Sequence, residues 1–266
     1  MPFTYGSHQA PVLALKLRWP DRFDGTAMAM GSMAPDWAYA LTSTSLQFDA
    51  HSLWGVLLFC VPVSVLAAWV LRRVAPVAFA YLPSPPGLPL GHLRVLGRRR
   101  PALSMSATSA RVGALSHVVW DLFTHDWQWG PRHIAWLRSS APAVLGRSST
   151  WAGMLQDVST VVGAVVAALV LGRILRSGAL LRWYGVAADD PGVTARPSGG
   201  AVRFWTIVVL SAVAGLVGAG MGDPGFAGRV IRLSLGAAVG VVAASVACAG
   251  QVRVPADADR PLGSPR

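Results

Sequence analysis

The sequence predicts an all-α fold: a polytopic membrane helical bundle with about five spanning helices and a short helical hairpin at the N-terminus. Composition gives the first reason. Charged residues make up 13% of the 266 residues, about half of the ~25% usual in soluble domains. Hydrophobic residues make up 53%, and the mean hydropathy is +0.47. The second reason is that several apolar runs approach the ~20 residues that an α-helix needs to cross a bilayer.

Two short segments near the N-terminus precede the longer apolar runs. "HQAPVLALKL" (8–17) and "GTAMAMGSMAPD" (25–36) predict two helices joined by the polar turn "RWPDRFDG". Five longer segments then follow as predicted spans: 52–71, 104–125, 151–172, 204–222 and 230–250. The last two are rich in Gly, Ala and Val, which suits close packing of helices in a membrane.

These segments suggest four parts along the chain. We expect a core over 1–175, a cytoplasmic linker over 176–203, a two-helix membrane hairpin over 204–250 and a disordered tail over 251–266. The linker sequence "YGVAADDPGVTARPSGG" and the tail sequence "VPADADRPLGSPR" have the composition of turns and disorder.

The net charge of +11 reflects membrane topology rather than nucleic-acid binding. The arginines gather at the ends of the apolar runs, without a basic stretch that alternates with aromatic residues. The segments 72–111, 173–203 and 251–266 carry fifteen arginines, against seven basic residues on the opposite side. We therefore expect those segments to face the cytoplasm, with membrane lipids and no nucleic acid as partners.

Three ionisable residues interrupt the apolar segment "SHVVWDLFTHD" (116–126). On a helix, His117, Asp121 and His125 advance by only ~40° per step and share one stripe. In the expected topology this helix runs outward, so the stripe lies in its outer half. His51 flanks the span 52–71 at the same surface, and we expect it at a similar depth.

The N-terminal hairpin supplies two further candidates. His8 begins the first short helix and Asp36 ends the second, so an antiparallel hairpin brings both to one edge. Pro35 ends the second helix and leaves Asp36 as an accessible carboxylate. We expect a metal site formed by six residues: His8, Asp36, His51, His117, Asp121 and His125. Imidazoles and carboxylates suit a divalent transition metal, Zn²⁺, Mn²⁺ or Fe²⁺, with Asp36 and Asp121 as the catalytic carboxylates.

Each of these residues also has a plainer interpretation. A histidine in a membrane bundle is often a hydrogen-bonded core residue. Asp121 pairs with His117 or His125 at ordinary helical spacing, His51 suits an interfacial anchor, and Asp36 suits a helix terminus. The other polar residues near the spans are expected in loops, at span ends or as solvated neighbours of the ligands: Asp49, His92, Asp126, His133, Asp157 and Asp223.

Four blocks of the sequence resemble a known family. "MPFTYGSHQAPVLAL", "GSMAPDWAYAL", "HSLWGVLLF" and "GALSHVVWDLFTHDWQWG" look like the bacterial membrane-protein family called domain of unknown function 4184, over most of residues 1–175. The pattern is more distantly similar to inner-membrane-associated metal-dependent hydrolases. The resemblance implies five metal ligands, His8, Asp36, His51, His117 and Asp121, whereas His125 matches only the closer family.

The sequence departs from the distant group directly after Asp36. Trp37, Ala38 and Tyr39 stand where those hydrolases have further polar residues, so a second metal ion is not implied. The closer family carries no established activity, and the resemblance therefore implies a fold and a set of residues rather than a substrate.

Two functions fit these observations. The first is a membrane-embedded metal-dependent hydrolase. Its substrate would be lipid-derived, a lipid-linked or envelope phosphoester. The alternative is a non-enzymatic membrane protein in which the His/Asp cluster is structural or lines an ion or proton path. A transporter is less expected, because the sequence shows no inverted repeat.

Overall fold

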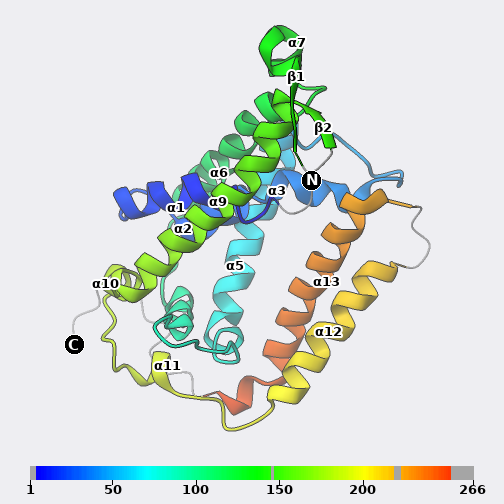
Figure 1. The fold of residues 1–266 in the computed structure, drawn as a ribbon. Helices are drawn as coiled ribbons and strands as arrows, with labels where there is room; N and C mark the ends of the chain where they lie inside the picture. The colour runs from blue at the N-terminus through cyan, green and yellow to red at the C-terminus, as the bar shows by residue number, and fades with distance from the viewer. Residues whose placement is uncertain (1–3, 145–146, 219–222, 253–266) are drawn as a thin grey trace.

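The computed structural model describes residues 4–144, 147–218 and 223–252. It confirms the all-α prediction, since helices dominate and the sheet found in these residues is one small antiparallel hairpin (Figure 1). That hairpin pairs β1 (Ser140–Val144) with β2 (Arg147–Thr150).

The predicted N-terminal hairpin is present, but its second helix is divided. After α1 (Gln9–Arg18), the segment 25–36 forms α2 (Gly25–Gly31) and then α3 (Ala34–Trp37), which continues into η1 (Ala38–Leu41). Pro35 stands in the first turn of α3. Proline lacks an amide N–H and is tolerated at a helix start but not in its interior, so α2 ends and a new helix begins.

The remaining helices follow the predicted order. The first long helix is continuous through α4 (Leu53–Gly55), the π-helical turn η2 (Val56–Cys60) and α5 (Val61–Ala78). The chain then forms η3 (Leu90–Arg98), α6 (Leu103–Thr124), α7 (Trp129–His133), α8 (Ala135–Arg138), α9 (Trp151–Arg176), α10 (Ala179–Tyr184), α11 (Pro191–Thr194), α12 (Ala201–Val217), α13 (Gly225–Ala247) and η4 (Ala249–Gln251).

Three of the described helices are long and apolar enough to cross a membrane: Leu53–Ala78, Trp151–Arg176 and Gly225–Ala247. They carry exposed valine and leucine side chains, such as Val161 and Leu169 on α9, each 65% exposed. Lipid rather than water suits such surfaces. α12 is apolar but shorter. α6 has the expected length but is not among these three helices. The presence of about five spanning helices therefore stays a prediction. The end of the predicted span 204–222 and most of the expected tail lie outside the described residues.

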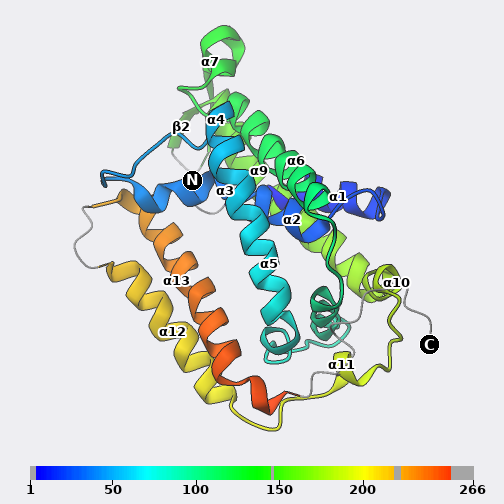
Figure 2. The same cartoon turned by 180° about the vertical axis from the view of Figure 1, so that it is seen from behind.

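The C-terminal helices form a hairpin beside the rest of the bundle. α12 and α13 run side by side, and Figure 2 shows α13 next to α5. At one end of the hairpin, Phe204 and Ala244 pack with Val77 and Tyr81 in one buried cluster. The segment 176–203 is more ordered than its composition suggests, because α10 and α11 bury apolar side chains against η3.

α2 and α6 approach each other backbone to backbone. A Cβ atom added at Gly31 would overlap the carbonyl oxygen of Ala110, and one at Gly113 would overlap the carbonyl oxygen of Met28. Glycine is therefore required on both helices at this crossing, as is common where membrane helices pack closely. The crossing fixes the position of α2 against the middle of α6.

A buried ion pair holds the other end of α2. Asp24 caps α2 by accepting from Ala27 N, and it also accepts from Arg72 on α5 and from Ser106 on α6. Its own backbone N–H donates to Ser109 Oγ at 2.9 Å. Asp24 and Arg72 are 4% and 9% exposed. One carboxylate thus joins three helices, and its charge is balanced and hydrogen-bonded as a buried charge requires.

Asp24→Ala is expected to destabilise the bundle strongly, because it leaves the Arg72 guanidinium buried without its counter-ion. Removing one partner of a buried ion pair costs about 3–5 kcal/mol. Thermal unfolding in detergent measures the effect, with Asp223→Ala as the control, since Asp223 pairs with Arg229 at the exposed surface. Equal melting temperatures for the two variants would show that the Asp24 pair does not hold the helices together.

Gly113→Ala is expected to separate α2 from α6, because the new methyl group has no room against Met28. Overpacking of this kind costs about 1–3 kcal/mol. Gly250→Ala is the matched control, since a Cβ atom there meets open space. Cross-linking of cysteines introduced into α2 and α6, together with thermal unfolding, measures the separation. Unchanged cross-linking in Gly113→Ala would contradict the proposed backbone contact.

Candidate metal centre

Six polar side chains from separate parts of the chain meet at one end of α6. His8 directly precedes α1, Asp36 lies on α3, and His51 lies in the loop before α4. His117 and Asp121 lie on α6, and His125 follows it. Each histidine of the set has a ring nitrogen within 3.9 Å of a carboxylate oxygen of Asp36 or Asp121. The convergence expected from the sequence is therefore present.

His125 reaches the cluster in a different way from the one expected. The prediction of a helical stripe through His125 is wrong, because α6 ends at Thr124 and His125 is extended, with φ −114° and ψ 128°. The helix ends because α7 folds back onto it: a Cβ atom at Gly130 would lie 2.8 Å from the carbonyl oxygen of Leu122. His125 Nδ1 still lies 3.8 Å from Asp121 Oδ2.

A tight loop holds His51. Asp49 Oδ1 accepts a hydrogen bond from His51 N at 2.9 Å, and Ser52 caps α4 by accepting from Gly55 N at 3.0 Å. A Cβ atom at Gly55 would overlap the carbonyl oxygen of Asp49. The loop therefore lies directly on the first turn of the helix, which directs the His51 ring toward α6. Asp49, expected as a solvated neighbour of the ligands, positions His51 by accepting a hydrogen bond from its backbone N–H.

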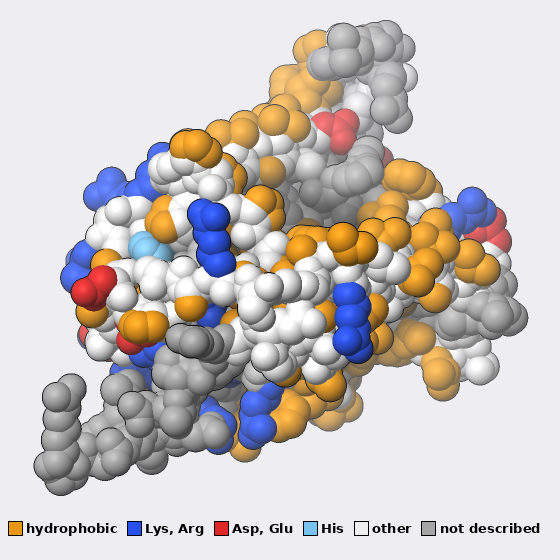
Figure 3. All heavy atoms as spheres, turned by 90° about the horizontal axis from the view of Figure 1, so that it is seen from below, with side chains coloured by type: hydrophobic (Ala, Val, Ile, Leu, Met, Phe, Trp, Pro, Cys, Tyr) orange, Lys and Arg blue, Asp and Glu red, His pale blue; other side chains and the backbone are white. Residues whose placement is uncertain are grey.

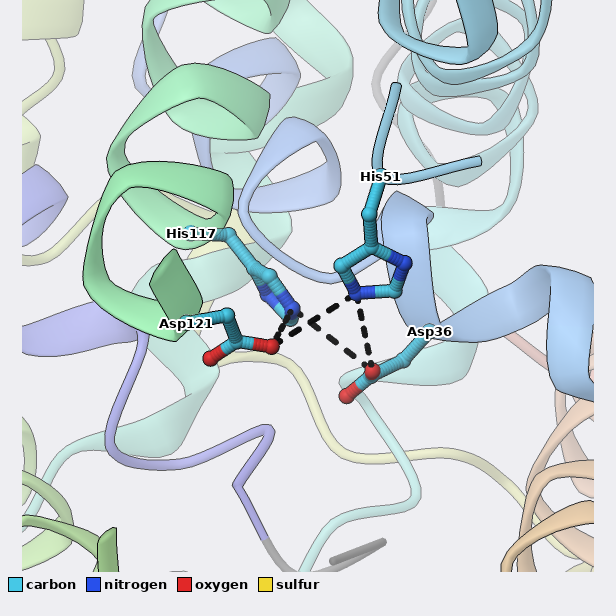
Figure 4. A group of neighbouring side chains, drawn as sticks. All are labelled: Asp36, His51, His117 and Asp121. Carbon is cyan, nitrogen blue, oxygen red and sulfur yellow. Dashed lines mark ion pairs between the residues drawn. The ribbon is translucent and has the colours of Figure 1, made fainter. Parts of the chain in front are cut away.

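Four of the six residues form the closest group (Figure 4). One ligand atom from each of Asp36, His51, His117 and Asp121 lies within 4.8 Å of the others. The Nε2 atom of His117 is 3.3 Å from Asp121 Oδ2 and 3.6 Å from Asp36 Oδ1. The Nε2 atom of His51 is 3.5 Å and 3.9 Å from the same two oxygens.

These distances fit a shared cation better than direct hydrogen bonds. An N–H···O bond spans about 2.7–3.2 Å, and all four distances are longer. Ligands placed ~2.1 Å from a tetrahedral metal ion lie ~3.4 Å from one another by simple geometry. The side chains of Figure 4 therefore point toward a common centre with nearly the spacing that such an ion sets.

The hydrogen bond at Nδ1 of His117 indicates the state of its other ring nitrogen, Nε2. His117 Nδ1 lies 2.8 Å from the carbonyl oxygen of Ser32, an acceptor only, so Nδ1 carries the proton. In a neutral imidazole, Nε2 then presents a lone pair. His117 Nε2, His51 Nε2 and Asp121 Oδ1 are all buried without a hydrogen-bond partner among the described residues. Two carboxylates beside these ring nitrogens need a positive charge, which either a proton on the imidazole or a bound cation supplies.

The two outer histidines surround this group. His8 stacks on His117 with ring centroids 3.8 Å apart, and its Nε2 lies 3.7 Å from Asp121 Oδ1. Burial, reinforced by His117, lowers the pKa of His8 to about 4. His8 is therefore uncharged at neutral pH, and the described ion pairs leave the two carboxylates with only histidine partners.

Thr4 is a site residue that the sequence pattern did not identify. Its hydroxyl donates to Asp36 Oδ2 at 3.1 Å, which leaves Asp36 Oδ1 directed at the histidines. A threonine in an N-terminal "FTYGSH" segment carries no spacing signal, although it stands one helical turn before His8. The two remaining histidines lie outside the cluster, as expected: His92 contacts the carbonyl oxygen of Leu175, and His133 contacts that of Trp129.

Two pockets adjoin the cluster and share Trp127. One, of about 470 Å³, is lined by His51, Tyr39 and Phe48 among others. The second, of about 720 Å³, begins at His125 and extends to Val161 and neighbouring valines on α9, which is long and apolar enough to cross a membrane. The second pocket therefore has polar lining residues at His125 and Asp126 and apolar ones on α9.

Comparison with known proteins gives a family but no activity. A family model described as a domain of unknown function (DUF4184) matches residues 1–250. The match therefore extends beyond the expected 1–175 and includes the C-terminal hairpin. Among curated proteins and among solved structures, no match was found.

His117→Ala is expected to abolish metal binding while the bundle stays folded, because the residue lies at the centre of the donor group. Elemental analysis of detergent-purified protein measures the metal, with His133→Ala as the control, since that exposed histidine lies outside the cluster. Stoichiometric metal in the wild type and in His133→Ala, but not in His117→Ala, is the expected result. A wild-type protein without transition metal after purification and reloading would rule out the centre.

Proposed function

The chain belongs to the DUF4184 family, whose description names no activity, and we propose from the site itself that it is a metal-dependent hydrolase of a lipid-derived phosphoester. The observation that carries the proposal is the group of two carboxylates and two imidazoles around one centre, with three buried atoms that have no hydrogen-bond partner among the described residues. Two negative charges and neutral imidazoles complement one divalent cation.

Asp36, His51, His117 and Asp121 would hold the ion. When bound, such an ion lowers the pKa of a water molecule and polarises a phosphoryl oxygen. Ser32 fixes the tautomer of His117 through its carbonyl oxygen. An orienting hydrogen bond behind a ligating histidine is the usual arrangement in metal sites.

The two carboxylates differ in what their second oxygen can do. Asp36 Oδ2 already accepts from Thr4, so Asp36 is suited to hold a fixed position. Asp121 Oδ1 has no hydrogen-bond partner in the described part of the chain and lies near His8 Nε2. It is therefore the oxygen available to accept a proton from an attacking water molecule, and His8 is placed to stabilise it afterwards.

The surroundings favour a substrate with both polar and apolar parts. The larger pocket runs from His125 to exposed valines on α9, so a lipid chain would lie against the helix while the phosphoester faces the cluster. Gln156, which is 5% exposed, lines the same pocket, and its Oε1 atom has no partner among the described residues. That oxygen is suited to accept a hydrogen bond from a head-group hydroxyl.

A structural metal site is the second candidate. Four protein ligands complete a tetrahedral shell, and closed shells of this kind are typical of structural zinc. The adjoining pockets and the free oxygen of Asp121 favour catalysis instead, because a purely structural site needs neither. Loss of fold and yield in His117→Ala would favour the structural function.

Asp121→Asn is expected to lower phosphoester hydrolysis by about 10²–10⁴-fold, the usual contribution of a general base. The assay uses metal-loaded protein with a chromogenic aryl phosphate and with phosphatidic acid in mixed micelles. Asp189→Asn is the control, since Asp189 is exposed and far along the chain in the segment between α10 and α11.

Comparison of the wild type with Asp121→Asn and Asp189→Asn separates the two candidate functions. Activity in the wild type and in Asp189→Asn, with loss in Asp121→Asn, supports hydrolysis. Bound metal in all three without turnover of either substrate, together with loss of fold in His117→Ala, would overturn hydrolysis and leave the structural centre.

A further inference from the structure

A second polar pocket lies at the other end of the first long helix. Arg73 stands nineteen residues after Trp54, which corresponds to about 28 Å of helix at 1.5 Å per residue. That length matches the ~30 Å hydrocarbon core of a bilayer. Trp54 and Trp69 are both exposed, as expected of aromatic residues near the two membrane surfaces. Arg72 and Arg73 therefore stand where α5 leaves the hydrocarbon.

The pocket has a volume of about 190 Å³ and is formed between α5 and the start of α6. Trp69, Arg72 and Arg73 line it on α5. Gly97, Arg100 and Leu103 line it from η3, the segment after it and the start of α6. A Cβ atom at Gly97 would lie 2.9 Å from the carbonyl oxygen of Arg72, so η3 packs directly against α5 beside the pocket.

Arg72 supplies an unsatisfied donor at this pocket. The side chain is 9% exposed, and its Nη2 atom donates to Asp24. Its Nε atom is buried and has no hydrogen-bond partner among the described residues. A buried guanidinium N–H without an acceptor is costly, and an oxygen atom of a ligand in the pocket would satisfy it.

The side chains that line the pocket are basic rather than acidic. They include three arginines and no aspartate, and Asp24 pairs with Arg72 from outside the lining. The Arg73 guanidinium lies over the Trp69 ring, 4.8 Å from its centroid, which holds its charge at the edge of the pocket. Figure 3, which views the molecule from below, shows arginine and lysine side chains spread over that face and few acidic ones.

The outer wall of the pocket is apolar. Leu103 is 71% exposed and Trp69 50%, and Leu66 continues this surface along α5. Small anions in water do not need such a wall, whereas acyl chains do. Basic pockets between membrane helices at the cytoplasmic side are typical sites for anionic lipid head groups.

We propose that this pocket binds the phosphate of an anionic phospholipid, with the guanidinium groups of Arg72, Arg73 and Arg100 around the phosphate. The acyl chains would lie along the exposed faces of Trp69, Leu66 and Leu103. A zwitterionic lipid brings a cation beside the phosphate and is disfavoured by the arginines. The site is separate from the His/Asp cluster and does not depend on hydrolysis.

The test compares lipid binding to the full-length, delipidated protein in detergent by native mass spectrometry and by thermal stabilisation. Phosphatidylglycerol is expected to bind at least tenfold more tightly than phosphatidylcholine. Arg73→Gln/Arg100→Gln is expected to lose this preference, since each arginine near the membrane surface strengthens binding of anionic lipid several-fold. Arg132→Gln/Arg229→Gln is the matched control, because it removes the same charge from exposed positions outside the pocket.

Three results would overturn the proposal: equal binding of the two lipids, unchanged preference in Arg73→Gln/Arg100→Gln, or stabilisation by inorganic phosphate equal to that by phosphatidylglycerol. The last would assign the pocket to a free anion. Circular dichroism confirms that the double variant is folded, which is expected because Arg73 and Arg100 are exposed. His117→Ala is expected to keep the lipid preference, so the outcome is independent of the proposed hydrolase.

Discussion

The close approach of α2 to α6 at Gly31 and Gly113 is the constraint on which the site depends. Because neither glycine has a side chain, the two backbones touch, and the end of α2 lies against the middle of α6. This contact brings the carbonyl oxygen of Ser32 within hydrogen-bonding distance of His117 Nδ1. The proton position on His117, and therefore the direction of its lone pair, follows from a packing contact between two helices. Asp36, four residues after Ser32, is then carried to the opposite side of the same histidine ring.

The two buried polar centres of this apolar chain differ in how completely they are satisfied. At Asp24, a carboxylate meets a guanidinium, a serine hydroxyl and a backbone amide, so its charge and its lone pairs are matched. At Asp121 and Asp36, two carboxylates lie 3.3 Å and 3.6 Å from the His117 ring, longer than usual hydrogen bonds, and buried atoms have no partner among the described residues. The carboxylate of the first centre is matched, although Arg72 Nε remains without a partner among the described residues. The second centre needs a positive charge, from protonated imidazoles or from a cation, and it groups four metal-ligand atoms around one point.

Periodicity and topology predicted much of this arrangement from the sequence. The spacing of His117 and Asp121 placed both on one helical stripe, and the hairpin argument brought His8 and Asp36 to one edge. The predictions failed where tertiary contacts decide the backbone. α6 stops before His125 because α7 packs against its last turn, and α2 separates from α3 at a proline that suits a helix start. Thr4 was not predicted because a single hydroxyl group has no periodic signal in the sequence, and its partner Asp36 lies 32 residues away.

α2 connects the two polar centres although it has only seven residues. The residue before it, Asp24, binds Arg72, and the residue after it, Ser32, binds His117. The eight residue steps from Asp24 to Ser32 place these anchors about 12 Å apart along the helix, so neither centre can shift along α6 without breaking a buried hydrogen bond at the other. The same short helix is pressed against α6 by two glycines, which leaves it little freedom to tilt. Rigid support of this kind suits a metal centre, since donor atoms keep the spacing of a tetrahedral shell only when the backbones that carry them do not move.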